Sequence, residues 1–166
     1  YTYSKNDRKF EKMNNGNWYP FKFDRTHDIS IVVNYKINEK IDVSATWVYM
    51  TGNAFTLTQG QYEYISPFPE NSYEGYDPTD NSVHIYNGKN SVRLPSYHRL
   101  DIGANFMKVK KKGTRIWSVS IYNLYNRQNA FFYYYRKNND GLHSLHQMTI
   151  FPIIPNVSYR FLFGTK

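Results

Sequence analysis

The sequence predicts an all-β fold, a segment of an antiparallel transmembrane β-barrel with about five long strands. Apolar and polar residues alternate with period two over segments of about 10 to 15 residues. Such segments exceed the ~5–6 residues usual in soluble sheets and suit the ~9–11 tilted residues that cross a bilayer. Short turns and long loops also alternate along the chain, as in outer-membrane barrels. Aromatic residues make up 19% of the chain, yet its mean hydropathy is −0.71. This combination suits a β-barrel with aromatic girdles at the bilayer interfaces and a polar interior.

The first two strands are expected at about residues 23–37 and 41–51, joined by the tight turn Asn38-Glu39-Lys40. Each strand has one apolar face and one mostly polar face, so together they predict an amphipathic hairpin. Residues 52–95 show no sustained periodicity and carry several Pro, Gly and Asn residues, which predicts a long loop. A loop of this length inside a compact domain counts against the assignment, unless the loop is functional.

The pattern resumes at Tyr97, and the third and fourth strands are expected on either side of the Lys110 to Gly113 turn. A second long connection covers about residues 126–142. The last segment, 143–163, is interrupted by Pro152 and Pro155, which leaves one bent strand or two shorter strands open. The side chains expected to contact lipid are Ile29, Ile31, Val33, Val43, Ala45, Trp47, Ile102, Ala104, Val119 and Ile121.

The chain closes on a strand with Val157, Tyr159, Phe161 and Phe163 on one face. Its other face carries the mainly polar residues Asn156, Ser158, Arg160 and Leu162. An aromatic face opposite a polar one suits a barrel strand with lipid on one side and a wet lumen on the other.

Five local motifs occur in order along the chain: DRTHD at 24–28, WVYMTG at 47–52, LPSYHRLDI at 94–102, IYNLYNRQN at 121–129 and PIIPNVSYRF at 152–161. In this order they resemble the C-terminal barrel strands of TonB-dependent receptors, most like those of Bacteroidetes bacteria. The resemblance covers nearly the whole chain, from about Phe23 to Phe163.

The resemblance implies a barrel of about 22 strands with short periplasmic turns, long extracellular loops and an N-terminal plug. Residues 1–163 would form the last strands of this barrel, and residues 164–166 a short tail. It implies a location in the outer membrane of a Gram-negative bacterium and import of a nutrient of the siderophore, glycan or peptide class. The implied partners are outer-membrane lipid, the rest of the barrel and its plug, and TonB, which engages a plug segment outside this sequence. A surface lipoprotein is a further candidate partner.

The aromatic residues of the expected outer loops are the candidate substrate-binding residues, because their rings can stack on a sugar, peptide or chelate. They are Trp18, Tyr19, Phe68, Tyr73, Tyr76, Phe132, Tyr133 and Tyr134. The candidate lumen-facing residues are Arg99, Asp101 and Arg160, and a structural ion pair between Arg99 and Asp101 is favoured over contact with substrate. His143 and His146 point to opposite faces of a strand, which disfavours a metal site.

No catalytic constellation, phosphate-binding loop or cofactor motif is recognisable, so we expect neither an enzyme nor a cofactor. The net charge of +8 and the aromatic content also suit a nucleic-acid-binding module. The basic residues are dispersed, however, rather than interleaved with rings on one face, so we expect no nucleic-acid partner. The main alternative is a soluble secreted β-domain that binds glycans through its Tyr-rich loops.

Overall fold

The computed structural model describes residues 1–63, 82–137 and 143–164, and these residues form an all-β protein with antiparallel sheets. The chain divides into two compact units. The first contains residues 1–3, 27–51 and 96–166, and the second contains residues 4–26 and 52–95. The predicted Phe68, Tyr73 and Tyr76 lie outside the described residues.

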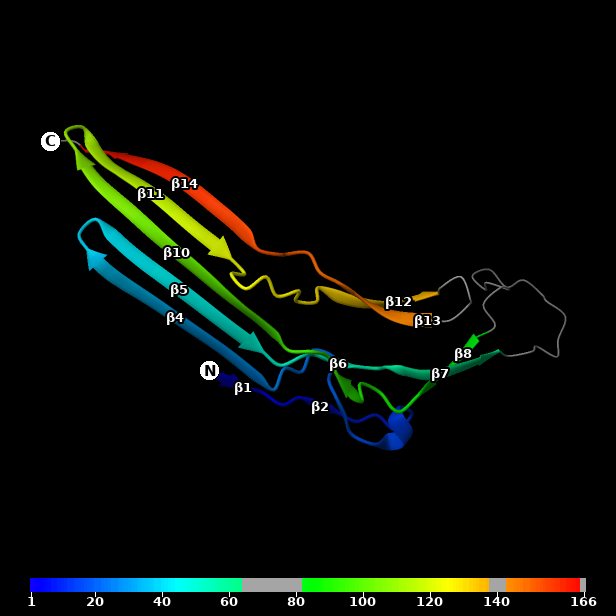
Figure 1. The fold of residues 1–166 in the computed structure, drawn as a ribbon. Helices are drawn as coiled ribbons and strands as arrows, with labels where there is room; N and C mark the ends of the chain where they lie inside the picture. The colour runs from blue at the N-terminus through cyan, green and yellow to red at the C-terminus, as the bar shows by residue number, and fades with distance from the viewer. Residues whose placement is uncertain (64–81, 138–142, 165–166) are drawn as a thin grey trace. The chain divides into compact units, whose positions relative to one another are not determined.

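The first unit is built on a six-stranded antiparallel sheet with the order β1-β4-β5-β10-β11-β14 (Figure 1). Its strands are β1 (Thr2–Tyr3), β4 (His27–Asn38), β5 (Ile41–Met50), β10 (Tyr97–Lys110), β11 (Gly113–Tyr122) and β14 (Ile154–Phe163). The prediction of about five long antiparallel strands is therefore confirmed. A closed barrel is not formed by the described residues, because β4 and β14 lie near the two edges of an open sheet.

Both short turns form where the sequence predicts them. In the first, the Asn38 side chain accepts a hydrogen bond from the backbone N–H of Lys40 at 2.8 Å. The second needs glycine, because Gly113 has φ +150° and a Cβ there would lie 2.1 Å from the carbonyl oxygen of Leu162. Glycine is therefore required at this position both because β14 approaches closely and because the backbone adopts a positive φ.

The last segment forms two strands rather than one bent strand. β13 (His143–Met148) pairs with β12 (Phe132–Lys137) in a separate hairpin, and β14 begins only at Ile154 (Figure 1). The connection expected over residues 126–142 thus contains a strand of its own.

In its described residues, 4–26, 52–63 and 82–95, the second unit has three short two-stranded pairs and a single 3₁₀ turn, η1 (Asn14–Gly16). The pairs are β2 (Asp7–Arg8) with β3 (Tyr19–Pro20), β6 (Ala54–Phe55) with β9 (Val92–Arg93), and β7 (Thr58–Glu63) with β8 (Ser82–Tyr86). Within the described part of residues 52–95 the chain is therefore more ordered than the absence of periodicity predicted.

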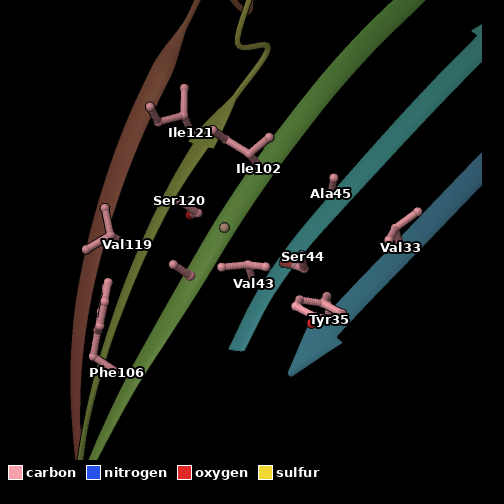
Figure 2. Close-up of a pocket in the computed structure, with 12 residues that line it drawn as sticks. Val33, Tyr35, Val43, Ser44, Ala45, Ile102, Phe106, Val119, Ser120 and Ile121 are labelled. Atoms are coloured by element: carbon pink, nitrogen blue, oxygen red, sulfur yellow. The ribbon is translucent and has the colours of Figure 1, made fainter. Parts of the chain in front are cut away.

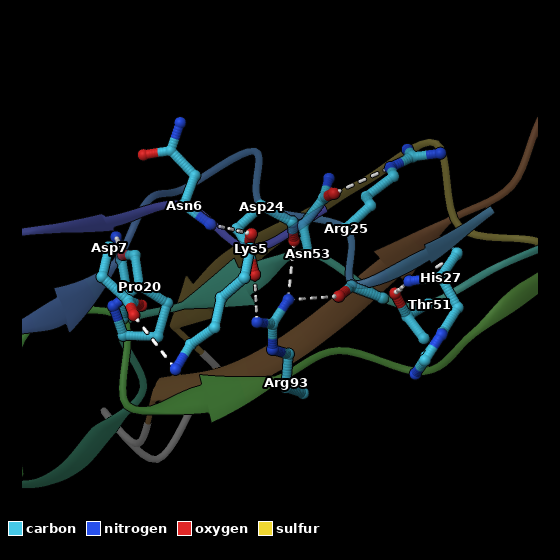
Figure 3. Close-up of polar contacts among 12 residues, drawn as sticks. Lys5, Asn6, Asp7, Pro20, Asp24, Arg25, His27, Thr51, Asn53 and Arg93 are labelled. Atoms are coloured by element: carbon cyan, nitrogen blue, oxygen red, sulfur yellow. Dashed lines mark hydrogen bonds and ion pairs between the residues drawn. The ribbon is translucent and has the colours of Figure 1, made fainter. Parts of the chain in front are cut away.

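A buried ion pair crosslinks distant parts of this second unit. The side chain of Asp24 is fully buried and pairs with Arg93, as Figure 3 shows. Asp24 also accepts a hydrogen bond from the backbone N–H of Asn6 at 2.7 Å, and Arg93 donates to the Asp24 carbonyl at 2.6 Å. Both carboxylate oxygens of Asp24 have a hydrogen-bonding partner, so the burial of this carboxylate is compensated.

The six-stranded sheet is a single layer. Ile116 is the one buried hydrophobic residue among the described residues of the first unit. Apolar side chains in the middle of the long strands stay open, with Val33 54% and Val119 41% exposed. A soluble sheet normally covers such a face with a second layer, so this sheet leaves a large apolar surface without a protein partner in the described chain.

Candidate functional site

The most distinctive surface of the molecule is an apolar face that runs in register across all five long strands. Residues opposite one another in an antiparallel pair point to the same side of the sheet. The central row is Val33, Ala45, Ile102, Ile121 and Pro155, and the next is Tyr35, Val43, Ala104, Val119 and Val157. The residues predicted to share an apolar face therefore do so, and we call this surface the apolar face.

An aromatic belt crosses the apolar face at the end with the short turns. Phe106, Trp117 and Tyr159 are paired across β10, β11 and β14. The rings of Trp117 and Tyr159 lie 4.9 Å apart between centroids, and these side chains are 43% and 52% exposed. We call this row the turn-end belt.

A second aromatic belt crosses the apolar face where the strands lead into the long connections. Trp47 and Tyr49 stack at 6.0 Å, and Tyr49 stacks on His98 at 6.5 Å. His98 continues the row to Tyr125, with its Nδ1 2.8 Å from the Tyr125 hydroxyl. We call this row the loop-end belt.

The distance between the two belts can be compared with the height of the apolar band on outer-membrane barrels. His98 and Phe106 are eight residues apart on β10, which corresponds to about 26 Å along a strand at ~3.3 Å per residue. A strand tilt of about 40° reduces this to about 20 Å along a barrel axis, close to the ~25 Å apolar band of outer-membrane barrels. The aliphatic rows lie between the belts.

Between the belts the apolar face contains a shallow hollow of about 570 Å³ (Figure 2). The short side chains of Ala45 and Ala104 line it together with larger ones. The larger apolar side chains of its lining are Val33, Tyr35, Val43, Ile102, Phe106, Val119 and Ile121.

The opposite face of the sheet is polar and extensively hydrogen-bonded. Asn105 donates to Asp42 at 2.8 Å and accepts from the Ser118 hydroxyl at 2.5 Å. These three residues come from β5, β10 and β11, so the contacts tie neighbouring strands together. We call this surface the polar face.

All three predicted lumen residues lie on the polar face. Arg99 pairs with Asp101 at 2.9 Å, donates to the Tyr97 and Tyr122 hydroxyls at 2.9 and 2.6 Å, and lies 4.1 Å above the Tyr122 ring. Arg160 is opposite Ile116 on the same side. The Arg99 and Asp101 side chains are only 22% and 26% exposed, so the favoured ion pair forms and is integrated into the polar face of the sheet.

The predicted aromatic residues near the N-terminus differ sharply in accessibility. Trp18 is 67% exposed, whereas Tyr19 is 6% exposed, with its ring 6.4 Å from that of Phe10. The Tyr19 hydroxyl also donates to the sulfur of Met13 at 3.4 Å. The prediction that Tyr19 binds substrate therefore disagrees with its burial, since Tyr19 forms part of the small core of its unit. Trp18 is the ring that a ligand can reach.

The predicted aromatics of the last long connection lie on the β12–β13 hairpin. Phe132 and Tyr134 share one face, 44% and 41% exposed, and Tyr134 stacks on His146 at 5.6 Å. Tyr133 points to the other face and donates to the Gln147 side chain at 3.1 Å. Partial burial raises the pKa of the Tyr133 hydroxyl, against a smaller opposing effect of Arg127. Phe132 and Tyr134 thus form a ladder of rings open to a ligand.

Sequence reasoning missed the asparagines that fix the chain after β11. Asn123 is fully buried with φ +54°, and its side chain bonds the backbone of Arg127 and Phe151. Asn126 and Asn129 similarly bond the backbone of Ile153 and His98. The signal was the cluster of Asn residues in a segment that must reverse direction, because asparagine tolerates positive φ and bonds nearby backbone.

No family model, curated protein or solved structure matches this chain. Among the residues described here, no group of three or more His, Asp or Glu side chains could hold a metal ion. Nor does the described part of the chain include a helix that is both long and apolar enough to cross a bilayer.

Proposed function

We propose that this chain forms the C-terminal part of the wall of an outer-membrane β-barrel of the TonB-dependent receptor type, which imports a nutrient. The observation that carries the proposal is the apolar face, with its aliphatic rows between two aromatic belts and a hydrogen-bonded polar face behind it. This order of surfaces suits lipid on one side and a water-filled lumen on the other.

The open edges of the sheet support a larger barrel. Among the described residues, β14 pairs with β11 alone, and the outer side of β4 meets only the two residues of β1. Unpaired strand edges are not tolerated in the hydrocarbon region. In the proposed receptor, further strands pair with both edges and close the wall.

In this proposal each unit offers exposed rings for ligand binding. These are Trp18 in the second unit and, separately, Phe132 and Tyr134 in the first, and each can stack on a glycan, a peptide side chain or an aromatic chelate. Arg99, Asp101 and Arg160 line the lumen, and TonB acts through a plug segment elsewhere in the receptor. A surface lipoprotein is a candidate partner at the loop end.

Fractionation of the cell envelope tests this proposal. The full protein is expected in the outer-membrane fraction, resistant to extraction by salt or alkali and monodisperse only in detergent. An intact protein that is released by osmotic shock and stays monodisperse in buffer would overturn the proposal.

That second outcome would favour the alternative function, a secreted glycan-binding domain. The specific observation in its favour is the exposed ladder of Phe132, Tyr134 and His146 on one face of a hairpin. Flat arrays of rings of this kind can stack on sugar rings. The large uncovered apolar face argues against this function, because a soluble domain of this size would bury it.

A further inference from the structure

We propose that the short-turn end of the apolar face holds an anionic phospholipid, with its phosphate at Lys108 and Arg115 and one acyl chain in the hollow above Ala45 and Ala104. This inference rests on the proposed membrane location and names a specific lipid class and site within it. Phosphatidylglycerol is the probe that fits this chemistry.

The headgroup site is a basic row directly beyond the turn-end belt. Lys108 and Arg115 are opposite one another on β10 and β11, and Arg115 is opposite Phe161 on β14. Two residues separate this row from Phe106 and Trp117 on the same face, or about 7 Å along the strand. The cations therefore lie at the level where lipid phosphates meet an aromatic belt.

Among the residues that the structure describes, these cations have no anion to neutralise them. The carboxylates of the long strands, Asp28, Asp42 and Asp101, all lie on the polar face. Glu39 in the neighbouring turn pairs with Lys36, at 2.8 Å. Among the described residues, no carboxylate lies within ion-pair distance of Lys108 or Arg115. An adjacent guanidinium and ammonium group without a carboxylate partner can bind a phosphate.

The hollow gives the same site an apolar compartment. Phe106 borders the hollow and lies two residues before Lys108 on the same face, so the basic row and the hollow are adjacent. A volume of about 570 Å³ falls within the ~300–1,000 Å³ of typical ligand sites. Nine of its twelve lining residues are aliphatic or aromatic, which suits an acyl chain.

The two ends of the apolar face differ in charge, which assigns the anionic lipid to one of them. The loop-end belt consists of Trp47, Tyr49, His98 and Tyr125, and Arg127 lies near His98 with its guanidinium donating to the Ser96 carbonyl at 3.0 Å. At the turn end two cations, Lys108 and Arg115, are opposite one another on the apolar face. An anionic headgroup is therefore favoured at the turn end, by roughly fivefold for each cation near the membrane surface.

The test is a competition for bound lipid on the full protein in mild detergent. Equal amounts of phosphatidylglycerol and phosphatidylethanolamine with identical acyl chains are added, and the lipid that copurifies is quantified by mass spectrometry. The unaltered protein is expected to retain phosphatidylglycerol at least tenfold in excess. The double variant Lys108→Gln, Arg115→Gln is expected to lose this preference.

The matched control is the double variant Lys36→Gln, Arg160→Gln, which removes the same charge from the polar face at the same end. It is expected to keep the preference. Ala104→Phe fills the hollow and is expected to lower total retained lipid while leaving the basic row intact. Circular dichroism confirms that each variant keeps its β-structure.

The outcomes separate this inference from the proposed function. A protein that requires detergent but shows no preference, or whose preference survives loss of Lys108 and Arg115, overturns the lipid site and leaves the barrel proposal standing. Equal loss in the control variant also overturns it, because bulk charge would then explain the binding. A protein that is monodisperse without detergent overturns both.

Discussion

At the scale of single residues, the sheet is secured by buried polar side chains that bond backbone groups. Asn123 is the clearest example, since its side-chain nitrogen donates to the carbonyls of Arg127 and Phe151 at 2.9 and 3.1 Å. Its side-chain oxygen accepts from the Arg127 N–H at 3.0 Å. One side chain thus ties the end of β11 to the segment that precedes β14.

Replacement of Asn123 by alanine is expected to lower the free energy of unfolding by about 3 kcal/mol, because buried backbone groups lose their partners and alanine must adopt a positive φ. Asn123→Gly is the matched control: it loses the same bonds but tolerates φ +54°. Glycine is therefore expected to be less damaging by about 1 kcal/mol. Urea unfolding of the reconstituted protein measures both. Equal stability of the alanine variant and the parent would contradict this role.

The Arg99–Asp101 pair is expected to contribute to stability rather than to ligand binding. A double-mutant cycle with Arg99→Met and Asp101→Asn should give a coupling energy of about 1 kcal/mol, the upper range for a partly exposed pair. Asp101 accepts a hydrogen bond from the backbone N–H of Asn123 at 2.9 Å, and Asp101→Asn keeps a side-chain oxygen that can accept it. Unfolding measurements give the cycle directly. A coupling near zero, with ligand affinity lost instead, would assign the pair to the substrate.

At the scale of elements, the long strands could be predicted because each carries its own periodicity. β4, β5, β10, β11 and β14 alternate one apolar and one polar face, and period two needs no tertiary information to recognise. The short pairs β2–β3 and β6–β9 have only two residues per strand, too few to show a period. The β12–β13 hairpin could not be predicted from periodicity, because aromatic residues occupy both faces of β12 and no apolar–polar alternation results.

Two adjacent residues of β14 give a direct test of which face meets lipid. Val157 and Ser158 are both exposed, Val157 by 60%, so in water an arginine at either position should change stability by less than about 0.5 kcal/mol. In a bilayer Val157→Arg is expected to cost about 2 kcal/mol, below the midplane maximum because this row lies near the turn-end belt. Ser158→Arg, on the polar face, is expected to stay near neutral. Unfolding from liposomes measures the difference, and equal costs would contradict a lipid-facing Val157.

At the scale of the whole molecule, the candidate site depends on register, which the sequence alone does not give. Each strand predicts its own apolar face, but the two aromatic belts exist only because Trp117 meets Tyr159 and Tyr49 meets His98 across strands. The hollow likewise needs Ala45 and Ala104 on neighbouring strands. The loop aromatics were identified by composition, which cannot distinguish the exposed Trp18 from the buried Tyr19.

Because the sequence has no cysteine, single cysteines can be introduced to test which residues of the long strands face each side of the sheet. Single cysteines at Val33 and Val119 lie on the apolar face, and cysteines at Asn34 and Ser120 lie on the polar face. In a bilayer the first two are expected to resist a charged, water-soluble maleimide and to react with an apolar one, because hydrocarbon excludes the charged reagent. The polar-face cysteines are expected to react with both reagents through the lumen.

The exposure of Val33 and Val119 in the described chain lets this labelling test distinguish a membrane barrel from a secreted glycan-binding domain. Val33 and Val119 are 54% and 41% exposed, so in a water-soluble domain their cysteines would label readily with the charged reagent. A lipid covering reverses that order while leaving Asn34 and Ser120 accessible. The same alternation on β4 and β11, separated by two strands in the sheet, would mean that one continuous apolar surface faces the bilayer. Labelling without alternation would assign both faces to water.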